Sequence, residues 1–406
     1  MIESPVRNGA LKGLKIIDLT MMLAGPFATM LLGDQGATII KVEPVKSGDL
    51  TRTLNLPKGD MPYGAYYQSI NRNKLSIALD LKSETGKDVL RRLVKDADVL
   101  VENYRVGVME RLDLSYESLA KINPRLVYAT VRGFGDPRTG KSPYADWPAF
   151  DVIAQAMGGI MGITGPDANT PLKIGPGVGD IVPAMLAAVG ILAAVRHAEK
   201  TGEGQFVDVA MYDSILALCE RIVYQHSYDG AVPGPEGNSH PLLCPFGLFP
   251  AADGWVSIAC PQDHFWKILA TSMGKPELAD DVRYSLNASR VKHNAEVVAL
   301  VSEWTKTLTK KQLAVILGGK IPFGPVNNAA DIFADPHTHV REMLAEVEQP
   351  GKGKVRIAGT PIRMTKTPGG VARRGALLGE DTDIILRDAG YTQAEITALH
   401  SNGTVR

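Results

Sequence analysis

The chain has 406 residues, of which 45% are hydrophobic and 22% charged, and its 44 basic residues balance its 44 acidic residues. This size allows two domains and a large buried core, and the composition is ordinary for a soluble α/β protein. Because no net charge attracts the chain to a polyanion, nucleic acid is not an expected partner, and a phosphorylated ligand would need a local cluster of cations.

Strand and helix signals alternate from the N-terminus to about Gly135. One expected helix follows Gly25-Pro26, and another covers residues 87–94. The expected strands cover residues 15–19, 37–42, 75–79, 98–101 and 126–131. This alternation predicts an α/β fold with a Rossmann-like parallel sheet and helices on both faces. Ligands of such folds bind at the carboxyl ends of the strands, where we expect Gly25, Glu43, Asn103 and Arg132.

The composition of the chain changes between about residues 232 and 261, where Gly and Pro separate short segments with the alternating pattern of strands, such as 255–259. Helical patterns continue through Leu317, residues 355–357 return to a strand pattern, and Thr392-Gln393-Ala394-Glu395 forms a capping box that opens a final helix. We therefore predict the first part of a large Rossmann-like domain in 1–225, a small α+β domain in 226–330, and a linker with a return to the large domain in 331–406.

No segment indicates secretion or membrane insertion. Residues 1–7 contain no apolar signal-peptide core, and the nearly uncharged run 181–195 is shorter than the roughly 20 residues that span a bilayer, which favours a buried helix. The three cysteines, Cys219, Cys244 and Cys260, are widely spaced and form no metal-ligand pair. We expect free thiols in a reducing cytoplasm, no metal and no membrane partner.

Asp180 ends the segment Ile174-Gly175-Pro176-Gly177-Val178-Gly179-Asp180, directly before the apolar run. Three glycines at alternate positions let backbone approach a ligand closely. A carboxylate at such a turn can act as a nucleophile toward an activated acyl group. Asp is also a preferred helix N-cap, and from this segment alone both interpretations stand.

Cationic side chains lie near the predicted strand ends: Arg72, Lys74, Arg105, Arg111 and Arg132. Taken singly, such residues are typical of a solvated surface, but Arg and Lys together can hold phosphates. The chain contains neither a dinucleotide fingerprint nor a phosphate-binding GxxxxGK[ST] motif. With Asp180, the cations indicate a phosphorylated ligand that carries an acyl group.

Several motifs together resemble those of class III CoA transferases, the family of formyl-CoA and carnitine-CoA transferases, along almost the whole chain. The motifs are Leu11-Lys12-Gly13-Leu14-Lys15-Ile16-Ile17-Asp18, Ala24-Gly25-Pro26, Leu32-Gly33-Asp34-Gln35-Gly36-Ala37, Ile40-Lys41-Val42-Glu43-Pro44, Asn71-Arg72-Asn73-Lys74, Val101-Glu102-Asn103-Tyr104-Arg105 and Lys200-Thr201-Gly202-Glu203-Gly204-Gln205. The resemblance implies an interlocked homodimer. It also implies that coenzyme A enters as an acyl-CoA substrate and is not a permanently bound cofactor.

The resemblance implies that Asp180 is the nucleophile. It would attack the thioester carbonyl of an acyl-CoA to give a mixed anhydride and a CoA thiolate, and the thiolate would then form an aspartyl-CoA thioester. An incoming carboxylic acid reverses these steps and leaves as the new CoA ester. We expect N–H groups at the helix N-terminus to keep Asp180 ionised, so that the capping and catalytic interpretations are compatible.

By the same resemblance, the CoA site comprises Leu23, Ala24, Arg72, Asn73, Lys74, Asn103, Tyr104, Arg105 and Arg111, with Phe150 and Asp151 near the pantetheine end. Some members have a cation where this chain has Pro44, and Arg72 is expected to compensate. Formyl-CoA transferases cover the site with a run of glycines, where this chain has Gly237-Asn238-Ser239-His240-Pro241. His240 is either a substrate contact or a turn residue before Pro241.

Two other functions compete with CoA transfer. An α-methylacyl-CoA racemase needs two acid/base groups, and racemases have a histidine where this chain has Phe150, which carries no proton. A non-catalytic CoA-binding protein would have no need for Asp180. Residues 148–151 and 238–241 resemble the branch that uses small dicarboxylic acids such as succinate, mesaconate, itaconate or citramalate, and the exact acids stay open.

Overall fold

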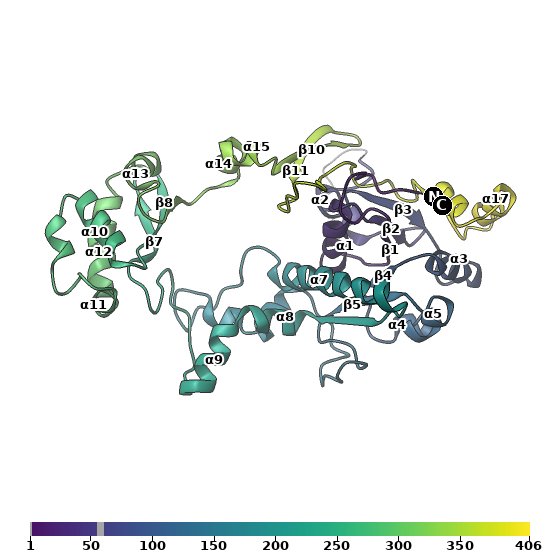
Figure 1. The fold of residues 1–406 in the computed structure, drawn as a ribbon, viewed down its shortest axis with the longest axis horizontal. Helices are drawn as coiled ribbons and strands as arrows, with labels where there is room; N and C mark the ends of the chain where they lie inside the picture. Colours follow the sequence, from purple (N-terminus) through teal and green to yellow (C-terminus); the bar gives the residue numbers. More distant parts are fainter. Residues whose placement is uncertain (1, 55–60) are drawn as a thin grey trace. The chain divides into compact units, whose positions relative to one another are not determined.

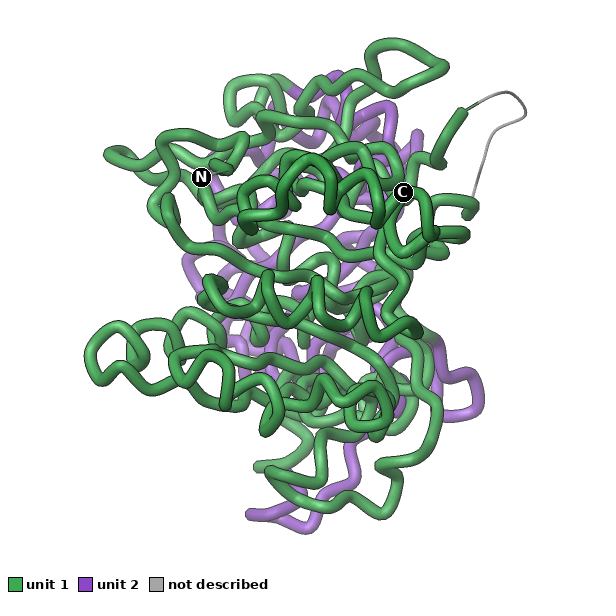
Figure 2. Tube along the Cα trace, turned by 90° about the vertical axis from the view of Figure 1, so that its right-hand side faces the viewer, with its two compact units in different colours: residues 1–160, 173–224, 336–406 green, residues 161–172, 225–335 purple. Residues whose placement is uncertain are grey.

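The computed structural model describes residues 2–54 and 61–406. The chain forms two compact units, coloured separately in Figure 2: unit 1 comprises the chain up to Ile160, Lys173–Tyr224 and Pro336–Arg406, and unit 2 comprises Met161–Leu172 and Gln225–Asp335. The sequence-based division kept Met161–Leu172 with the first domain. In the structure the N–H of Gly237 donates to the Gly165 carbonyl at 3.0 Å, which ties this segment into unit 2.

Unit 1 is built on a six-stranded parallel sheet in the order β3-β2-β1-β4-β5-β6 (Figure 1). Its strands are β1 Lys15–Asp18, β2 Thr38–Glu43, β3 Lys74–Ala78, β4 Val99–Glu102, β5 Val127–Arg132 and β6 Phe206–Ala210. The predicted α/β fold with a parallel sheet is confirmed. Sequence patterns missed β6, a five-residue edge strand with Asp208 at its centre. The strand order reverses between β1 and β4, where ligands bind in doubly wound folds.

Helices cover both faces of this sheet. On one face lie α3 Glu84–Lys95, α5 Tyr116–Ile122, α16 Thr382–Asp388 and α17 Gln393–Ser401, and on the other α1 Ala24–Asp34 and α7 Val178–Thr201. Because successive strand residues point to opposite faces, Ile17 joins the first core and Ile16 the second. The predicted capping box is present: the N–H of Thr392 donates to Glu395 Oε2 at 2.6 Å.

The remaining elements of unit 1 are shorter. They are the 3₁₀ turn η1 Leu50–Arg52, the helices α2 Ala65–Ile70, α4 Val108–Arg111, α6 Asp151–Met157, α8 Met211–Leu218 and α15 Pro336–Val340, and the hairpin of β10 Leu344–Gln349 with β11 Gly353–Ala358. The 3₁₀ turn η2 Ile160–Ile163 begins at the last residue of this segment of unit 1 and continues into unit 2. Helix α9 covers Glu220–Asp229 and crosses the boundary between the two units at Tyr224. The C-terminal segment returns to the sheet, since Val405 pairs with Leu79.

Unit 2 has an antiparallel sheet in the order β7-β8-β9, with β7 Phe246–Ala251, β8 Gly254–Ala259 and β9 Phe323–Pro325. Its helices are α10 Asp263–Ser272, η3 Pro276–Ala279, α11 Asn287–Lys292, α12 Asn294–Thr305, α13 Lys310–Leu317 and α14 Ala329–Ala334. Val256 and Ile258 are buried while Trp255 and Ser257 are exposed, the alternation of a sheet with one covered face. The core contains Phe249 and Trp266.

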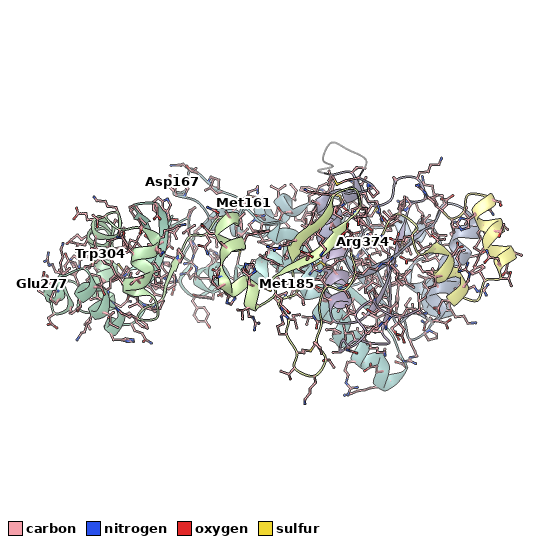
Figure 3. The ribbon with its side chains drawn as sticks, turned by 90° about the horizontal axis from the view of Figure 1, so that it is seen from above. Met161, Asp167, Met185, Glu277, Trp304 and Arg374 are labelled. Atoms are coloured by element: carbon pink, nitrogen blue, oxygen red, sulfur yellow. The ribbon has the colours of Figure 1, made fainter. Side chains whose placement is uncertain are left out.

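Helix α7 is long and apolar enough to cross a membrane by length and composition alone. It packs instead against α1, α6, α8 and β5, and Ala184, Ala187 and Ile191 are fully buried. The predicted buried helix is therefore confirmed for one face. The other face is exposed, with Met185 (labelled in Figure 3) and Val189, which keeps 64% of its surface accessible.

Candidate active site

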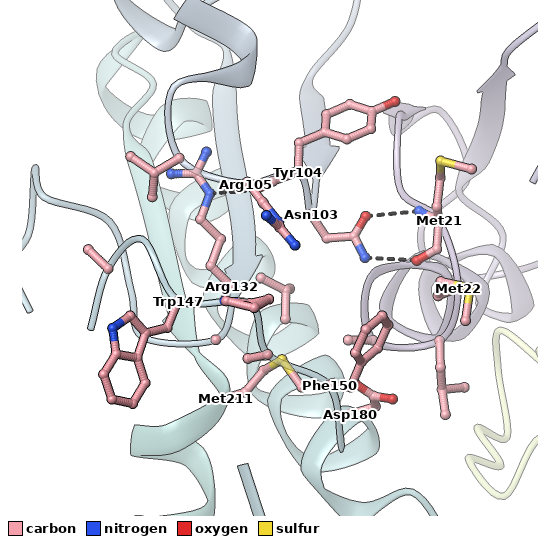
Figure 4. A pocket seen from close by; sticks show the side chains of 18 of the residues that line it. Met21, Met22, Asn103, Tyr104, Arg105, Arg132, Trp147, Phe150, Asp180 and Met211 are labelled. Atoms are coloured by element: carbon pink, nitrogen blue, oxygen red, sulfur yellow. Dashed lines mark hydrogen bonds between the residues drawn. The ribbon is translucent and has the colours of Figure 1, made fainter. Parts of the chain in front are cut away.

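A cavity of about 230 Å³ lies in unit 1 where β4 and β5 end and the loop from β1 to α1 begins (Figure 4). This first cavity is lined by Met21, Met22, Leu23, Ala24, Tyr66, Asn103, Tyr104, Arg105, Val106, Val131, Arg132, Gly133, Ala145, Trp147, Pro148, Ala149, Phe150, Asp180 and Met211. The cavity is therefore at the point where the strand order reverses.

Asn103, which follows β4, is hydrogen-bonded to the loop between β1 and α1. Its Nδ2 donates to the Met21 carbonyl at 2.8 Å, and the Met21 N–H donates to Asn103 Oδ1 at 2.9 Å (Figure 4). Met22 follows with a φ of 68°, a left-handed conformation that costs about 1–3 kcal/mol for a residue with a side chain. The paired hydrogen bonds help to hold the β1–α1 loop, which carries Leu23 and Ala24, in the cavity wall.

Asp180 lies in the first turn of α7 and lines the cavity (Figure 4). It does not cap the helix: the N-cap residue is Gly177, and the N–H of Asp180 donates to the Gly177 carbonyl at 3.1 Å. Within residues 2–54 and 61–406, the Asp180 carboxylate has no hydrogen-bond or ion-pair partner. The capping interpretation is therefore wrong, and this carboxylate is available to a ligand.

Burial raises the pKa of Asp180 to about 7, and the negative charge of Asp151 raises it further in the same direction. We expected helix N–H groups to keep the carboxylate ionised, and this expectation is wrong. The N–H of Gly179, in the first turn of α7, donates to Asp151 Oδ1 at 2.8 Å and leaves Asp180 unassisted. Protonated and ionised Asp180 therefore coexist near neutral pH.

The glycines before Asp180 allow the start of α7 to pack closely against the start of α6. A Cβ on Gly179 would lie 2.4 Å from the carbonyl oxygen of Asp151, and one on Gly177 would lie 3.1 Å from Leu23 Cδ2. Real Cβ atoms do not approach backbone as closely as 2.4 Å, so position 179 requires glycine for packing. The close approach that the sequence indicated is to the start of α6.

A second cavity of about 600 Å³ shares Tyr104 with the first. It is lined by Val42, Glu43, Pro44, Val45, Lys46, Ser47, Leu79, Asp80, Leu81, Lys82, Tyr104, Val108, Arg111, Leu112 and Gly403. Glu43 is neutralised by Arg52, whose Nη2 lies 2.7 Å from Glu43 Oε2. In the described part of the chain Lys46, Lys82 and Arg111 have no ion-pair partner, so this cavity favours an anionic ligand.

Three residues that we assigned to CoA do not reach either cavity. Arg72 Nη2 lies 2.7 Å from Asp34 Oδ2, Asn73 Nδ2 donates to Asp34 Oδ1 at 2.8 Å, and Lys74 Nζ lies 2.9 Å from Asp18 Oδ2. All three side chains are buried, and their polar groups are directed into the protein. We therefore assign them a structural role, and the cation that follows Pro44 in the wall of the second cavity is Lys46.

The other predicted site residues are distributed as follows. Leu23, Ala24, Asn103, Tyr104, Arg105 and Phe150 line the first cavity, Phe150 with 61% of its surface exposed, and Arg111 lines the second. Asp151 lines neither cavity, because its carboxylate accepts hydrogen bonds from Gly179 and Gln155. His240 lies in unit 2, where its ring packs 5.0 Å from Phe246, and its contact with substrate stays a prediction.

Sequence reasoning missed Tyr66, Trp147 and Met211 in the cavity wall. Burial and the charge of Asp180 raise the pKa of Tyr66 to about 12, so its hydroxyl stays a hydrogen-bond donor at neutral pH. Tyr66 and Trp147 belong to Gly- and Pro-containing segments without a regular apolar period. Large aromatic residues in such segments are the signal that would have identified them.

Residues 11–382 match CoA-transferase family III. The chain is 50% identical over 387 residues to the succinyl-CoA:mesaconate CoA-transferase of Haloarcula hispanica, covering 94% of this chain and 97% of that protein. It is 35% identical to the succinyl-CoA–D-citramalate CoA-transferase of Chloroflexus aurantiacus, covering 97% of this chain and 98% of that protein. A crystal structure of a CAIB/BAIF family protein from Brucella suis matches with a TM-score of 0.84 and 36% identity, covering 94% of this chain and 100% of that chain.

Proposed function

The chain belongs to CoA-transferase family III, and we propose that Asp180 carries the transfer of CoA between small dicarboxylic acids. The protein is a class III acyl-CoA:carboxylate CoA-transferase, and the resemblance inferred from its motifs is confirmed. The observation that carries the proposal is the Asp180 carboxylate in the wall of the first cavity, which has no hydrogen-bond or ion-pair partner among the residues that the structure describes.

The reaction follows from the chemistry of a carboxylate. Asp180 attacks the thioester carbonyl of the acyl-CoA, the C–S bond breaks, and a mixed anhydride and CoA thiolate form. The thiolate attacks the aspartyl carbonyl, which releases the donor acid and leaves an aspartyl-CoA thioester. The acceptor carboxylate then attacks this thioester, and the same two steps in reverse release the new acyl-CoA and free Asp180. Each intermediate contains one activated bond, either a thioester or an anhydride, so no ATP is needed.

The two cavities fit the two ends of an acyl-CoA. The thioester end belongs beside Asp180 in the first cavity, and the phosphates belong near Lys46, Lys82 and Arg111 in the second. Tyr104 lines both cavities, which supports a path for the pantetheine arm between them. CoA is thus a substrate that enters and leaves, and not a resident cofactor.

Relatives support a dicarboxylic substrate. The relative that is 50% identical is a succinyl-CoA:mesaconate CoA-transferase, and another acts on succinyl-CoA and D-citramalate. In the first cavity, Arg105 has no ion-pair partner among the described residues and offers a charge to an anionic group. We therefore propose succinyl-CoA as donor and a mesaconate-type acid as acceptor, tested by measuring a panel of donors against a panel of acids.

Racemisation is the second candidate, and the cavity wall argues against it. Abstraction and return of an α-proton need an acid/base group on each face of the carbon. Phe150 lies where a racemase would have its histidine, and none of the described residues that line the cavity is a histidine. Proton exchange at the α-carbon of a methyl-branched acyl-CoA in D₂O would favour racemisation, and its absence supports transfer.

Covalent trapping tests the mechanism directly. We expect incubation with succinyl-CoA and hydroxylamine to convert Asp180 to its hydroxamate, because both the anhydride and the aspartyl-CoA thioester react with this nucleophile. Peptide mass spectrometry should find the modification at Asp180 and should not find it when succinate replaces succinyl-CoA. A modification at another acidic residue, or none, would contradict the proposed nucleophile.

The phosphate assignment predicts a selective effect on substrate affinity. Lys82→Gln and Arg111→Gln are each expected to raise the KM for acyl-CoA about 10-fold or more with little change in kcat, because each removes a charge-assisted contact of about 1.5–3 kcal/mol. Lys87→Gln on α3 is the matched control, because Lys87 pairs with Glu84 outside the cavity. Equal KM values in all three variants would remove the second cavity from the CoA site.

We also propose that two copies of the chain associate, as the family resemblance implies. The exposed face of α7 carries Met185, Leu186, Val189 and Leu192, an apolar surface that favours burial against a partner. Val189→Glu is expected to weaken the dimer at least about 10-fold, because two unpaired carboxylates would enter a symmetric interface. Sedimentation velocity measures the shift, with Val315→Glu, at an exposed valine of unit 2, as the control. A wild-type monomer would end this proposal.

We propose a cytoplasmic location, and the thiols support this proposal. Cys219, Cys244 and Cys260 are all buried and free, which suits a reducing compartment. We therefore place this soluble enzyme in the cytoplasm.

A further inference from the structure

Gln155 in α6 is completely buried, and both ends of its amide are used. Its Nε2 donates to the two carboxylate oxygens of Asp151, at 2.9 and 3.0 Å, one helical turn earlier. Its Oε1 accepts from the N–H of Ile174 at 2.9 Å. Because the amide must donate on one side and accept on the other, its orientation is determined by these contacts.

Asp151 continues this chain of hydrogen bonds. Its Oδ1 accepts from the N–H of Gly179 at 2.8 Å, in addition to the bonds from Gln155. Ile174 and Gly179 are the two ends of the Gly-Pro-rich turn that precedes Asp180. One buried glutamine and one carboxylate therefore hold both ends of that turn to the start of α6.

The charged and titratable groups around Asp180 differ in what they contribute. Asp151 on α6 is the charged group that, together with burial, raises its pKa. Tyr66 on α2 lines the same cavity, as do Arg105 and Arg132 from the ends of β4 and β5. Asp213 on the neighbouring helix α8 is exposed and interacts electrostatically with Asp208. Asp151 is thus the one of these groups whose removal should act on Asp180 without removing a cavity-lining side chain.

We infer that Gln155 and Asp151 are positioning residues that hold the turn before Asp180 and set both the orientation of its carboxylate and its nucleophilic strength. This inference rests on the proposed role of Asp180. It differs from the assignment of Asp151 to CoA, because the Asp151 carboxylate is occupied by three N–H contacts and lines neither cavity. A more basic Asp180 is a stronger nucleophile, and a fixed turn presents it to the thioester carbonyl.

Two variants separate the two parts of this role. Gln155→Leu removes both links without adding charge, and we expect kcat to fall about 10–100-fold with the KM for acyl-CoA unchanged, because a misplaced nucleophile costs turnover. Asp151→Asn removes the negative charge, and we expect the pH midpoint of aspartyl-CoA formation to move from about 7 in the wild type toward lower pH by about one unit. Rapid-quench measurement of the half-reaction with succinyl-CoA between pH 5 and 9 gives both numbers.

Gln349→Leu is the matched control, because Gln349 is another buried glutamine of unit 1, whose Nε2 donates to the Tyr63 carbonyl at 3.1 Å. It should lose stability while kcat and the pH midpoint stay at wild-type values. If Gln155→Leu behaves like this control and Asp151→Asn keeps the wild-type midpoint, the two residues only stabilise the fold and the inference is overturned. Should Gln155→Leu fail to fold, the midpoint of Asp151→Asn decides.

Asp180→Asn distinguishes the failure of this inference from that of the proposed function. If Asp180→Asn still turns over, the proposed nucleophile is wrong and the positioning role falls with it. If Asp180→Asn is inactive while the Asp151 and Gln155 variants behave as wild type, the nucleophile stands and only the positioning role is rejected.

Discussion

Replacement of Asp180 by Asn is expected to lower the rate of CoA transfer by about 10⁴-fold or more, the scale seen when an enzyme loses its covalent nucleophile. An amide has nearly the same shape but forms neither the anhydride nor the aspartyl-CoA thioester. The assay follows transfer from succinyl-CoA to mesaconate. Asp180→Ala is tested as well, because deamidation of the new Asn would restore the aspartate. Asp88→Asn on the surface of α3 is the control that should keep full activity. Turnover by Asp180→Ala would contradict the covalent mechanism.

The same substitution should raise stability above neutral pH. Burial raises the pKa of Asp180 to about 7 from an ordinary value of 3.8, so between these values the folded state binds more protons than the unfolded state. Folding therefore loses stability as the pH rises from about 4 to 7, and the loss is complete above 7. Asn cannot ionise, so Asp180→Asn should melt above the wild type at pH 8 and close to it at pH 4. Thermal unfolding monitored by circular dichroism at both pH values checks this difference.

Lys74→Met is expected to destabilise unit 1 by about 3–5 kcal/mol, the usual cost of leaving one partner of a buried ion pair without the other. Lys74 Nζ lies 2.9 Å from Asp18 Oδ2, and both side chains are almost completely buried. Burial alone would raise the pKa of Asp18, but Lys74, Lys41, Thr20 and Thr29 lower it to about 2. The variant keeps the volume of the side chain and removes its charge, so chemical denaturation measures the loss of the pair.

The double variant Asp18→Asn/Lys74→Met is the informative companion. It removes both charges, and we expect it to recover part of the stability that Lys74→Met loses, because no uncompensated charge stays buried. Surface variant Lys87→Met, which breaks the pair with Glu84, should change stability by less than about 1 kcal/mol. If Lys74→Met proved as stable as Lys87→Met, the Asp18–Lys74 pair would not support the fold as inferred.

Much of the fold was readable from local patterns. Five of the six strands of the parallel sheet, the α1 helix and the capping box at Thr392 were predicted, because strand alternation, glycine-proline breaks and capping residues act over a few positions in the sequence. The edge strand β6 was missed, since its pairing with β5 depends on residues more than 70 positions away. The attachment of Met161–Leu172 to unit 2 is likewise a contact between distant segments.

The candidate site was likewise predicted only in part from the sequence. Asp180 and the cavity residues Asn103, Tyr104 and Arg105 were found from motifs, because each sits at the end of a strand or the start of a helix. Arg72 and Lys74 were assigned to phosphates because a sequence does not tell a buried cation from a free one. Only the fold brings Asp34 and Asp18 within hydrogen-bond distance of them.

The fold class and the family were inferred from residue types at fixed local spacings, and the family resemblance also named Asp180 as the proposed nucleophile. Contacts between distant segments determine which cations are paired, that Asp180 is not the N-cap of α7, and which hydrogen bonds Asp151 and Gln155 make to the turn before it. The physical reason is that burial, ion pairing and charge–charge distance are properties of segments far apart in the chain. These properties set the pKa and the availability of a side chain whose identity the sequence already names.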